Sequence, residues 1–156
     1  MKVVEQLKGM PDERFLEIYE ALSRDGFGPL DQEVARELKF RPQAVRRLPL
    51  AQRARRAKTL LQRTANAQLA YELFGTYLMT KCKDLVTGFL DATEVPHEEG
   101  MIQNVESDQP AGDKVAAAVA DLDERFDPAD VTLYLSMAAE QWPSVPEVDT
   151  VWRLRT

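Results

Sequence analysis

The chain has 156 residues, of which 44% are apolar and 29% charged, and its formal net charge is −6. This is the composition of a globular protein about one domain long, which excludes wholesale disorder and collagen-like repeats. With a single cysteine, Cys82, and a single histidine, His97, neither an internal disulfide nor a Cys/His zinc site is expected. No apolar run approaches the roughly 20 residues of a membrane span, and no signal peptide is recognised. We therefore expect a cytoplasmic protein with no membrane partner.

The charges are distributed unevenly along the chain. Residues 1–83 carry 16 basic and 10 acidic side chains, whereas residues 84–156 carry 4 basic and 16 acidic ones. The first part therefore has a net charge of +6 and the second a net charge of −12. The overall negative charge argues against a polyanionic partner because like charges repel. Because the first part is cationic, a polyanionic partner remains one of the alternatives.

Residues 1–49 are predicted to form an N-terminal helical hairpin region. Pro11 and the acids after it are typical of a helix start, because proline is tolerated there and acids favour the positive end of the helix dipole. Apolar side chains follow at positions 15, 18, 19 and 22, which is helical spacing. A short amphipathic turn of helix is expected before Pro11. Two further helices are expected after the one that starts at Pro11, over residues 28–41 and 42–48.

Residues 50–94 are predicted to form a long central helix, because they contain no proline and repeat apolar side chains at helical spacing. One straight helix of this length would measure about 65–70 Å, whereas the radius of gyration of a compact domain of this size is only roughly 15 Å. The helix must therefore break, near Gly75, or project and pair with another copy of the chain. We favour a long, bent helix at an oligomer interface, with Cys82 buried on its apolar stripe.

The remainder is predicted to be a loop followed by an acidic C-terminal helical hairpin. Prolines and glycines among polar residues mark residues 95–112 as the loop. Within the hairpin, residues 113–156, Asp127 and Pro128 indicate the start of a helix that Pro143 ends, and a short last helix follows. No stretch alternates as a strand does. The predicted fold is therefore all-α, a single-domain bundle of about six or seven helices with one long, bent central helix.

Residues 31–48 resemble the helix-turn-helix pattern of DNA-binding proteins. A small residue and flanking apolar residues stand at the spacing that fixes the crossing of two such helices: Val34, Ala35, Leu38, Phe40, Val45 and Leu48. Two features depart from the pattern, because Lys39 stands where the turn usually has glycine and Pro49 shortens the recognition helix. The alternative interpretation is an ordinary α-hairpin whose apolar faces join the core.

Seven cations lie between residues 46 and 63. On a helix the apolar residues of this stretch share one face, and the cations occupy most of the rest. Such a helix can neutralise phosphates, and the candidate nucleic-acid contacts are Arg46, Arg47, Arg53 and Arg56. The alternatives are a solvated face, or one covered by acidic residues of the same or a partner chain. A membrane surface is disfavoured, because the apolar face is mostly alanine and has no aromatic anchor.

His97, followed by two glutamates, is the candidate for proton transfer near neutral pH. No second histidine, nucleophile motif or glycine-rich phosphate loop accompanies it, so no catalytic residue, metal or cofactor is predicted. Trp142 and Trp152 either form an aromatic patch for a partner or complete the core.

The first functional hypothesis is a non-enzymatic helical interaction module. It would self-associate or dock a protein partner through the central helix and the region of Trp142 and Trp152. The alternative is a nucleic-acid-binding regulator that uses the segment at residues 31–48 and the basic helix at residues 53–63.

Overall fold

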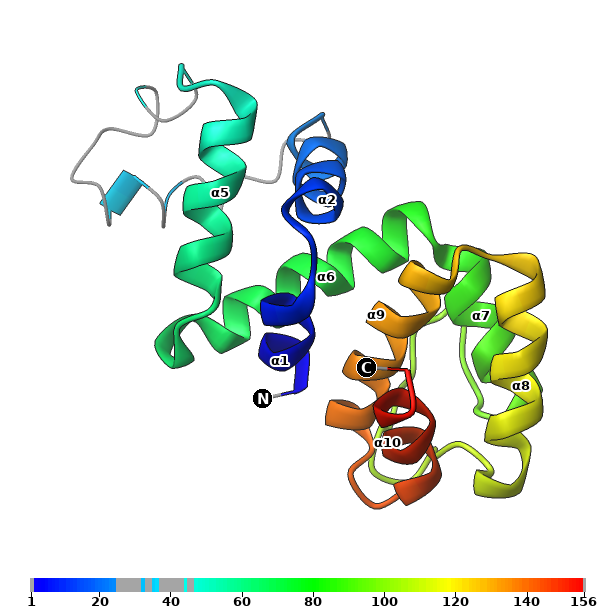
Figure 1. The fold of residues 1–156 in the computed structure, drawn as a ribbon. Coiled ribbons are helices and arrows are strands. Elements are labelled where there is room, and N and C mark those ends of the chain that lie inside the picture. The colour runs from blue at the N-terminus through cyan, green and yellow to red at the C-terminus, as the bar shows by residue number, and fades with distance from the viewer. Residues whose placement is uncertain (1, 25–31, 33–34, 37–43, 45–46, 156) are drawn as a thin grey trace. The chain divides into compact units, whose positions relative to one another are not determined.

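The computed structural model describes residues 2–24, 32, 35–36, 44 and 47–155. Every regular element in these ranges is a helix, so the predicted all-α class is confirmed. The elements, labelled in Figure 1, are α1 (Lys2–Gly9), α2 (Asp12–Arg24), α5 (Leu50–Leu61), the 3₁₀ helix η1 (Thr64–Asn66), α6 (Ala67–Lys81), α7 (Lys83–Ala92), α8 (Gly112–Arg125), α9 (Pro128–Gln141) and α10 (Pro146–Arg153). They form two compact units, of residues 3–77 and 78–156. None of the described helices is long and apolar enough to cross a membrane.

The first unit is built on the packing of α2 against α5. The apolar side chains predicted to face inward from α2 are all buried: Phe15, Ile18, Tyr19 and Leu22. From α5 the buried side chains are Ala54, Ala57, Leu60 and Leu61. Phe15 also meets Phe74 of α6 in an edge-to-face contact, with ring centroids 6.5 Å apart. One apolar face of each helix therefore makes the core, and their other faces are left to solvent.

The long, bent helix predicted over residues 50–94 is not found, because the chain there forms α5, η1, α6 and α7. The chain becomes extended at Arg63 (φ −77°, ψ 139°), and the Asn66 side chain donates a 2.8 Å hydrogen bond to the Leu60 carbonyl near the end of α5. In a longer helix, the Leu60 carbonyl would have accepted a hydrogen bond from the backbone amide four residues later. A second interruption lies at Cys82 (φ −129°, ψ 33°), between α6 and α7. Gly75, the expected break, lies inside α6.

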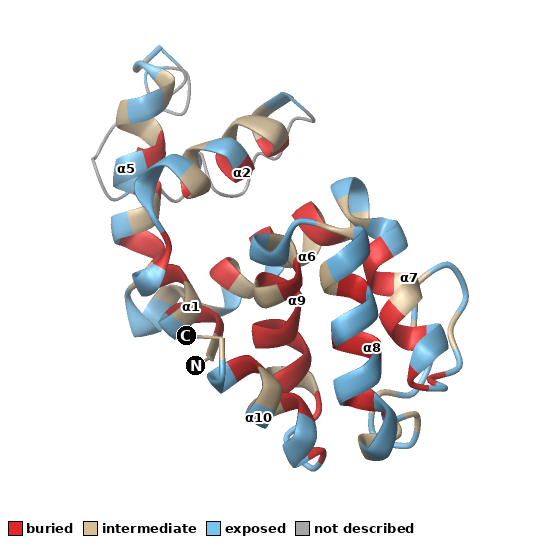
Figure 2. Cartoon of the chain, turned by 45° about the vertical axis from the view of Figure 1, so that its right-hand side comes forward, coloured by how far each residue is buried: buried red, intermediate tan, exposed pale blue. Residues whose placement is uncertain are grey.

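The second unit surrounds α9. Both α8 and α10 pack against this helix, and Figure 2 shows α9 buried along most of its length while α8 alternates between buried and exposed positions. The predicted start of α9 is confirmed, because the Asp127 carboxylate accepts a 2.9 Å hydrogen bond from the Ala129 amide and Pro128 follows it. Near the C-terminus, Arg155 makes two hydrogen bonds of 2.6 and 2.7 Å to Asp123 of α8 and a third to Thr132 of α9.

Candidate binding surface on α5

The basic helix predicted between residues 53 and 63 corresponds to most of α5. The helix begins after Pro49, which lacks an amide hydrogen and therefore fits a helix start. Its buried residues recur every three or four positions, so the opposite face points to solvent. Arg55 and Arg56 are exposed on α5, and Arg47 before the helix and Arg63 after it are exposed too. We call these four residues the cationic face.

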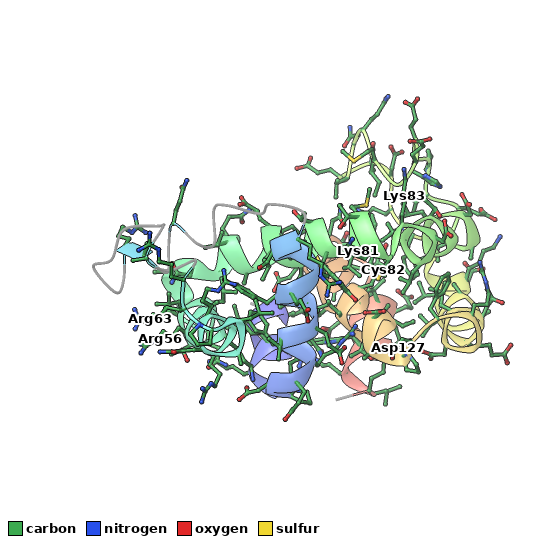
Figure 3. The ribbon with its side chains drawn as sticks, turned by 90° about the horizontal axis from the view of Figure 1, so that it is seen from above. Arg56, Arg63, Lys81, Cys82, Lys83 and Asp127 are labelled. Atoms are coloured by element: carbon green, nitrogen blue, oxygen red, sulfur yellow. The ribbon has the colours of Figure 1, made fainter. Side chains whose placement is uncertain are left out.

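Figure 3 shows Arg56 and Arg63 on the side of α5 turned away from α2. The acidic residues give a clearer signal on a finer scale than the charge difference between residues 1–83 and 84–156. Residues 38–71 contain nine Lys and Arg side chains and no Asp or Glu. Any carboxylate that neutralises this stretch must therefore be brought by another part of the fold.

The charge of Lys58 is neutralised by a carboxylate from another part of the fold, and its contacts hold α5 to α2. Its ammonium group donates hydrogen bonds to the Met10 carbonyl at 2.6 Å and to the Asp12 carboxylate at 2.8 Å. The Lys58 side chain is only 11% exposed. Because both acceptors lie at the start of α2, Lys58 fastens α5 to that end of α2.

Arg53, a predicted nucleic-acid contact, also faces α2. Its guanidinium carbon lies 5.9 Å from the centroid of the Tyr19 ring, within the range of a cation–π interaction. Its Nε atom is buried and has no hydrogen-bond partner among the described residues. The structure therefore separates Arg53, which packs on an aromatic ring, from Arg56, which is exposed.

A hollow of about 140 Å³ lies between α2 and α5, beside the cationic face. Its apolar lining consists of Phe15, Leu16, Ala51 and Ala54. Charged side chains complete its rim: Asp12 and Glu13 from α2, and Arg55 and Lys58 from α5. The first unit thus places an apolar depression next to an exposed arginine.

The Asp12–Lys58 pair makes the stability of this region depend on pH. The hydrogen bond and positive charge of Lys58 hold the pKa of the Asp12 carboxyl below its ordinary value of 3.8. A carboxyl whose pKa is lower in the folded chain stabilises the fold above the unfolded pKa, and this contribution is lost as the pH falls through the folded pKa. We expect Asp12→Asn to lower the urea midpoint modestly at about pH 6 and to have a smaller effect at about pH 2.5.

Urea unfolding followed by circular dichroism checks this prediction. Glu20→Gln is the control for losing a carboxylate of α2, because Glu20 forms a surface ion pair with Arg24 of the same helix. An Asp12→Asn effect of equal size at both pH values would contradict the assignment.

His97 holds a turn together through contacts of both its ring nitrogens. Its Nδ1 accepts a 3.0 Å hydrogen bond from the Gly100 amide, so its proton lies on Nε2, which is 2.6 Å from the Asp91 carboxylate. Both ring nitrogens are therefore engaged. Gly100 has φ +89°, a conformation that favours glycine, at the turn that brings Glu98 back to Met101. Among the described residues no group of three His, Cys, Asp or Glu side chains could hold a metal.

The structure places Trp142 and Trp152 in the core of the second unit. Both are fully buried, and the indole N–H of Trp142 donates to the Val105 carbonyl at 3.1 Å. Neither ring is therefore exposed, as the predicted aromatic partner patch would require.

Cys82 is half-buried and lies at the break between α6 and α7, not inside a continuous helix.

Most of the helix-turn-helix-like segment at residues 31–48, together with Arg46, lies outside the described residues. Comparison of the chain with protein-family models, with curated proteins and with solved structures gives no match. The cationic face and the hollow beside it are the features of the described chain that bear on function.

Proposed function

We propose that the first unit is a non-enzymatic binding module that docks an anionic protein segment on the cationic face of α5. One observation carries this proposal: Arg55 and Arg56 are exposed in the middle of a stretch that contains no acidic residue. Lys58 and Arg53, on the same helix, make contacts that hold α5 to α2. Arg55 and Arg56 are instead exposed on a helix whose buried face already fixes its position, and Arg55 lies at the rim of the hollow.

Arginine suits this role because its guanidinium group keeps its charge at all physiological pH values and can hydrogen-bond both oxygens of a carboxylate. A folded helix also presents such groups at fixed spacing, which reduces the entropy lost when a ligand binds. Attraction between exposed charges is screened by salt. Binding to this face is therefore expected to weaken as salt is added.

Nucleic-acid binding is the second candidate function, and the same face favours it. Exposed arginine side chains can contact phosphates, and such contacts carry no sequence information by themselves. Phosphates along a nucleic acid could therefore engage Arg55 and Arg56 as carboxylates would.

The test is a titration of two fluorescein-labelled probes, a poly-glutamate peptide of about 20 residues and a duplex DNA of about 20 base pairs. We expect poly-glutamate to bind at about 50 mM salt, with a Kd at least about 5-fold higher at about 200 mM salt. Binding of DNA alone, with a steeper salt dependence, would favour the second candidate. If neither probe binds at about 50 mM salt, the module proposal is wrong. Light scattering of the protein alone reports self-association.

A further inference from the structure

The hollow between α2 and α5 indicates what kind of anionic segment the cationic face takes. Its floor combines the ring of Phe15 with the small side chains of Ala51 and Ala54, so the apolar depression is open where a longer α5 side chain would have filled it. An apolar cavity of about 150 Å³ is enough to hold benzene. The hollow, at about 140 Å³, therefore has room for one bulky aliphatic side chain.

The rim of the hollow determines which charges can lie next to that side chain. Asp12 is paired with Lys58 at 2.8 Å, so these two charges offset each other. Arg55 on the α5 side and Glu13 on the α2 side remain, and both are exposed. A ligand group on the α5 side is thus attracted if it is a carboxylate, and the same group on the α2 side is repelled.

We infer that the partner is an acidic peptide segment that inserts one bulky aliphatic side chain into the hollow and pairs a neighbouring carboxylate with Arg55. This inference rests on the proposed function and specifies its ligand. It follows the general mode in which an apolar anchor enters a groove while flanking charges set orientation. A nucleic acid would use the arginines alone, because its sugar-phosphate backbone carries no aliphatic side chain.

The test compares two labelled acidic peptides that differ at one position, a central leucine or a central alanine, both otherwise built from Glu and Ala. Burying a leucine side chain is worth about 1.5 kcal/mol or more, so the leucine peptide is expected to bind wild-type protein about 10-fold more tightly. Poly-glutamate, which has no apolar anchor, serves as the charge-only probe.

Ala51→Leu is the diagnostic variant, because Ala51 is exposed, lines the hollow and lies in the first turn of a helix that tolerates leucine. We expect this variant to abolish the advantage of the leucine peptide and to leave poly-glutamate binding unchanged. Ala65→Leu, the same substitution at an exposed position of η1 that does not line the hollow, is the matched control and keeps the advantage. Glu13→Gln is expected to tighten the binding of both acidic peptides by about 2-fold, a gain that misfolding cannot produce.

Equal affinity of the leucine and alanine peptides for wild-type protein would overturn the inference and leave the proposed function standing, provided that poly-glutamate binds. Loss of the leucine advantage in Ala65→Leu as well as in Ala51→Leu would also overturn it. Weaker duplex DNA binding in Ala51→Leu, with no change for the leucine peptide, would contradict the choice of a peptide. Absence of binding by every anionic probe would show that both the inference and the proposed function are wrong.

Discussion

Replacing Trp152 with alanine is expected to lower the free energy of unfolding of the second unit by about 3–5 kcal/mol. The side chain is 2% exposed and belongs to α10, which packs on both α8 and α9. Removing a buried indole loses its transfer free energy and leaves a cavity that the neighbouring helices fill only in part. Folded domains are stable by only about 5–15 kcal/mol. This variant is therefore expected to unfold at a much lower urea concentration than wild type, which circular dichroism measures.

Leu154→Ala is the matched control, because Leu154 lies two residues away and is 82% exposed. Its effect on stability is expected to stay within about 0.5 kcal/mol. The comparison decides between the two roles considered for Trp152. A partner-binding tryptophan could be removed with little loss of stability, so an unchanged urea midpoint for Trp152→Ala would contradict its place in the core.

The sequence predicted those helices whose spacing and caps depend on residues that are close together in the chain. In α2 the apolar side chains from Phe15 to Leu22 follow helical spacing, and a helix with such a stripe can bury only that face. At the start of α9, Asp127 and Pro128 satisfy the requirements of a helix N-terminus without help from the rest of the chain. These elements could be recognised because their determinants are neighbours in sequence.

The breaks in the central region could not be recognised in that way. No proline or glycine marks the break after α5, which instead depends on the Asn66 side chain folding back onto the Leu60 carbonyl. Conversely, Gly75 carries the usual signal for a break, yet glycine inside a helix costs only about 1 kcal/mol, and packing can offset that. The break after α5 therefore coincides with a contact over six residues that no simple spacing rule signals, whereas the glycine signal at Gly75 leaves α6 unbroken.

The roles of the arginines on α5 were predictable only in part. Arg53 and Arg56 both looked like ligand contacts in the sequence, although Arg53 stands four positions before the buried Ala57 and so lies toward the packed face. What Arg53 meets there, the Tyr19 ring, depends on how α2 crosses α5. Arg55 was not among the predicted contacts, and we include it in the proposal because it is exposed and lines the hollow.

Reversing the charge of both Arg55 and Arg56, as Arg55→Glu with Arg56→Glu, is expected to weaken poly-glutamate binding about 30-fold at low salt. An exposed ion pair contributes about 0.2–1 kcal/mol. Reversal also replaces that attraction with a repulsion of similar size. Two reversals therefore cost about 2 kcal/mol, which corresponds to the expected change in Kd. Because both side chains are exposed, the urea midpoint is expected to stay close to that of wild type. Fluorescence anisotropy over a range of salt concentrations measures the effect.

The matched control is Arg125→Glu with Arg153→Glu, two exposed arginines of α8 and α10 that lie outside the first unit. This double variant changes the net charge of the chain by the same amount, so it reproduces any long-range repulsion of an anionic probe. If the cationic face is the binding surface, the control lowers affinity by about 3-fold at most under the same conditions, because exposed charges that make no contact with the probe are partly screened by salt. Equal losses in the two double variants would show that the probe responds to net charge alone, and α5 would then have no special part in binding.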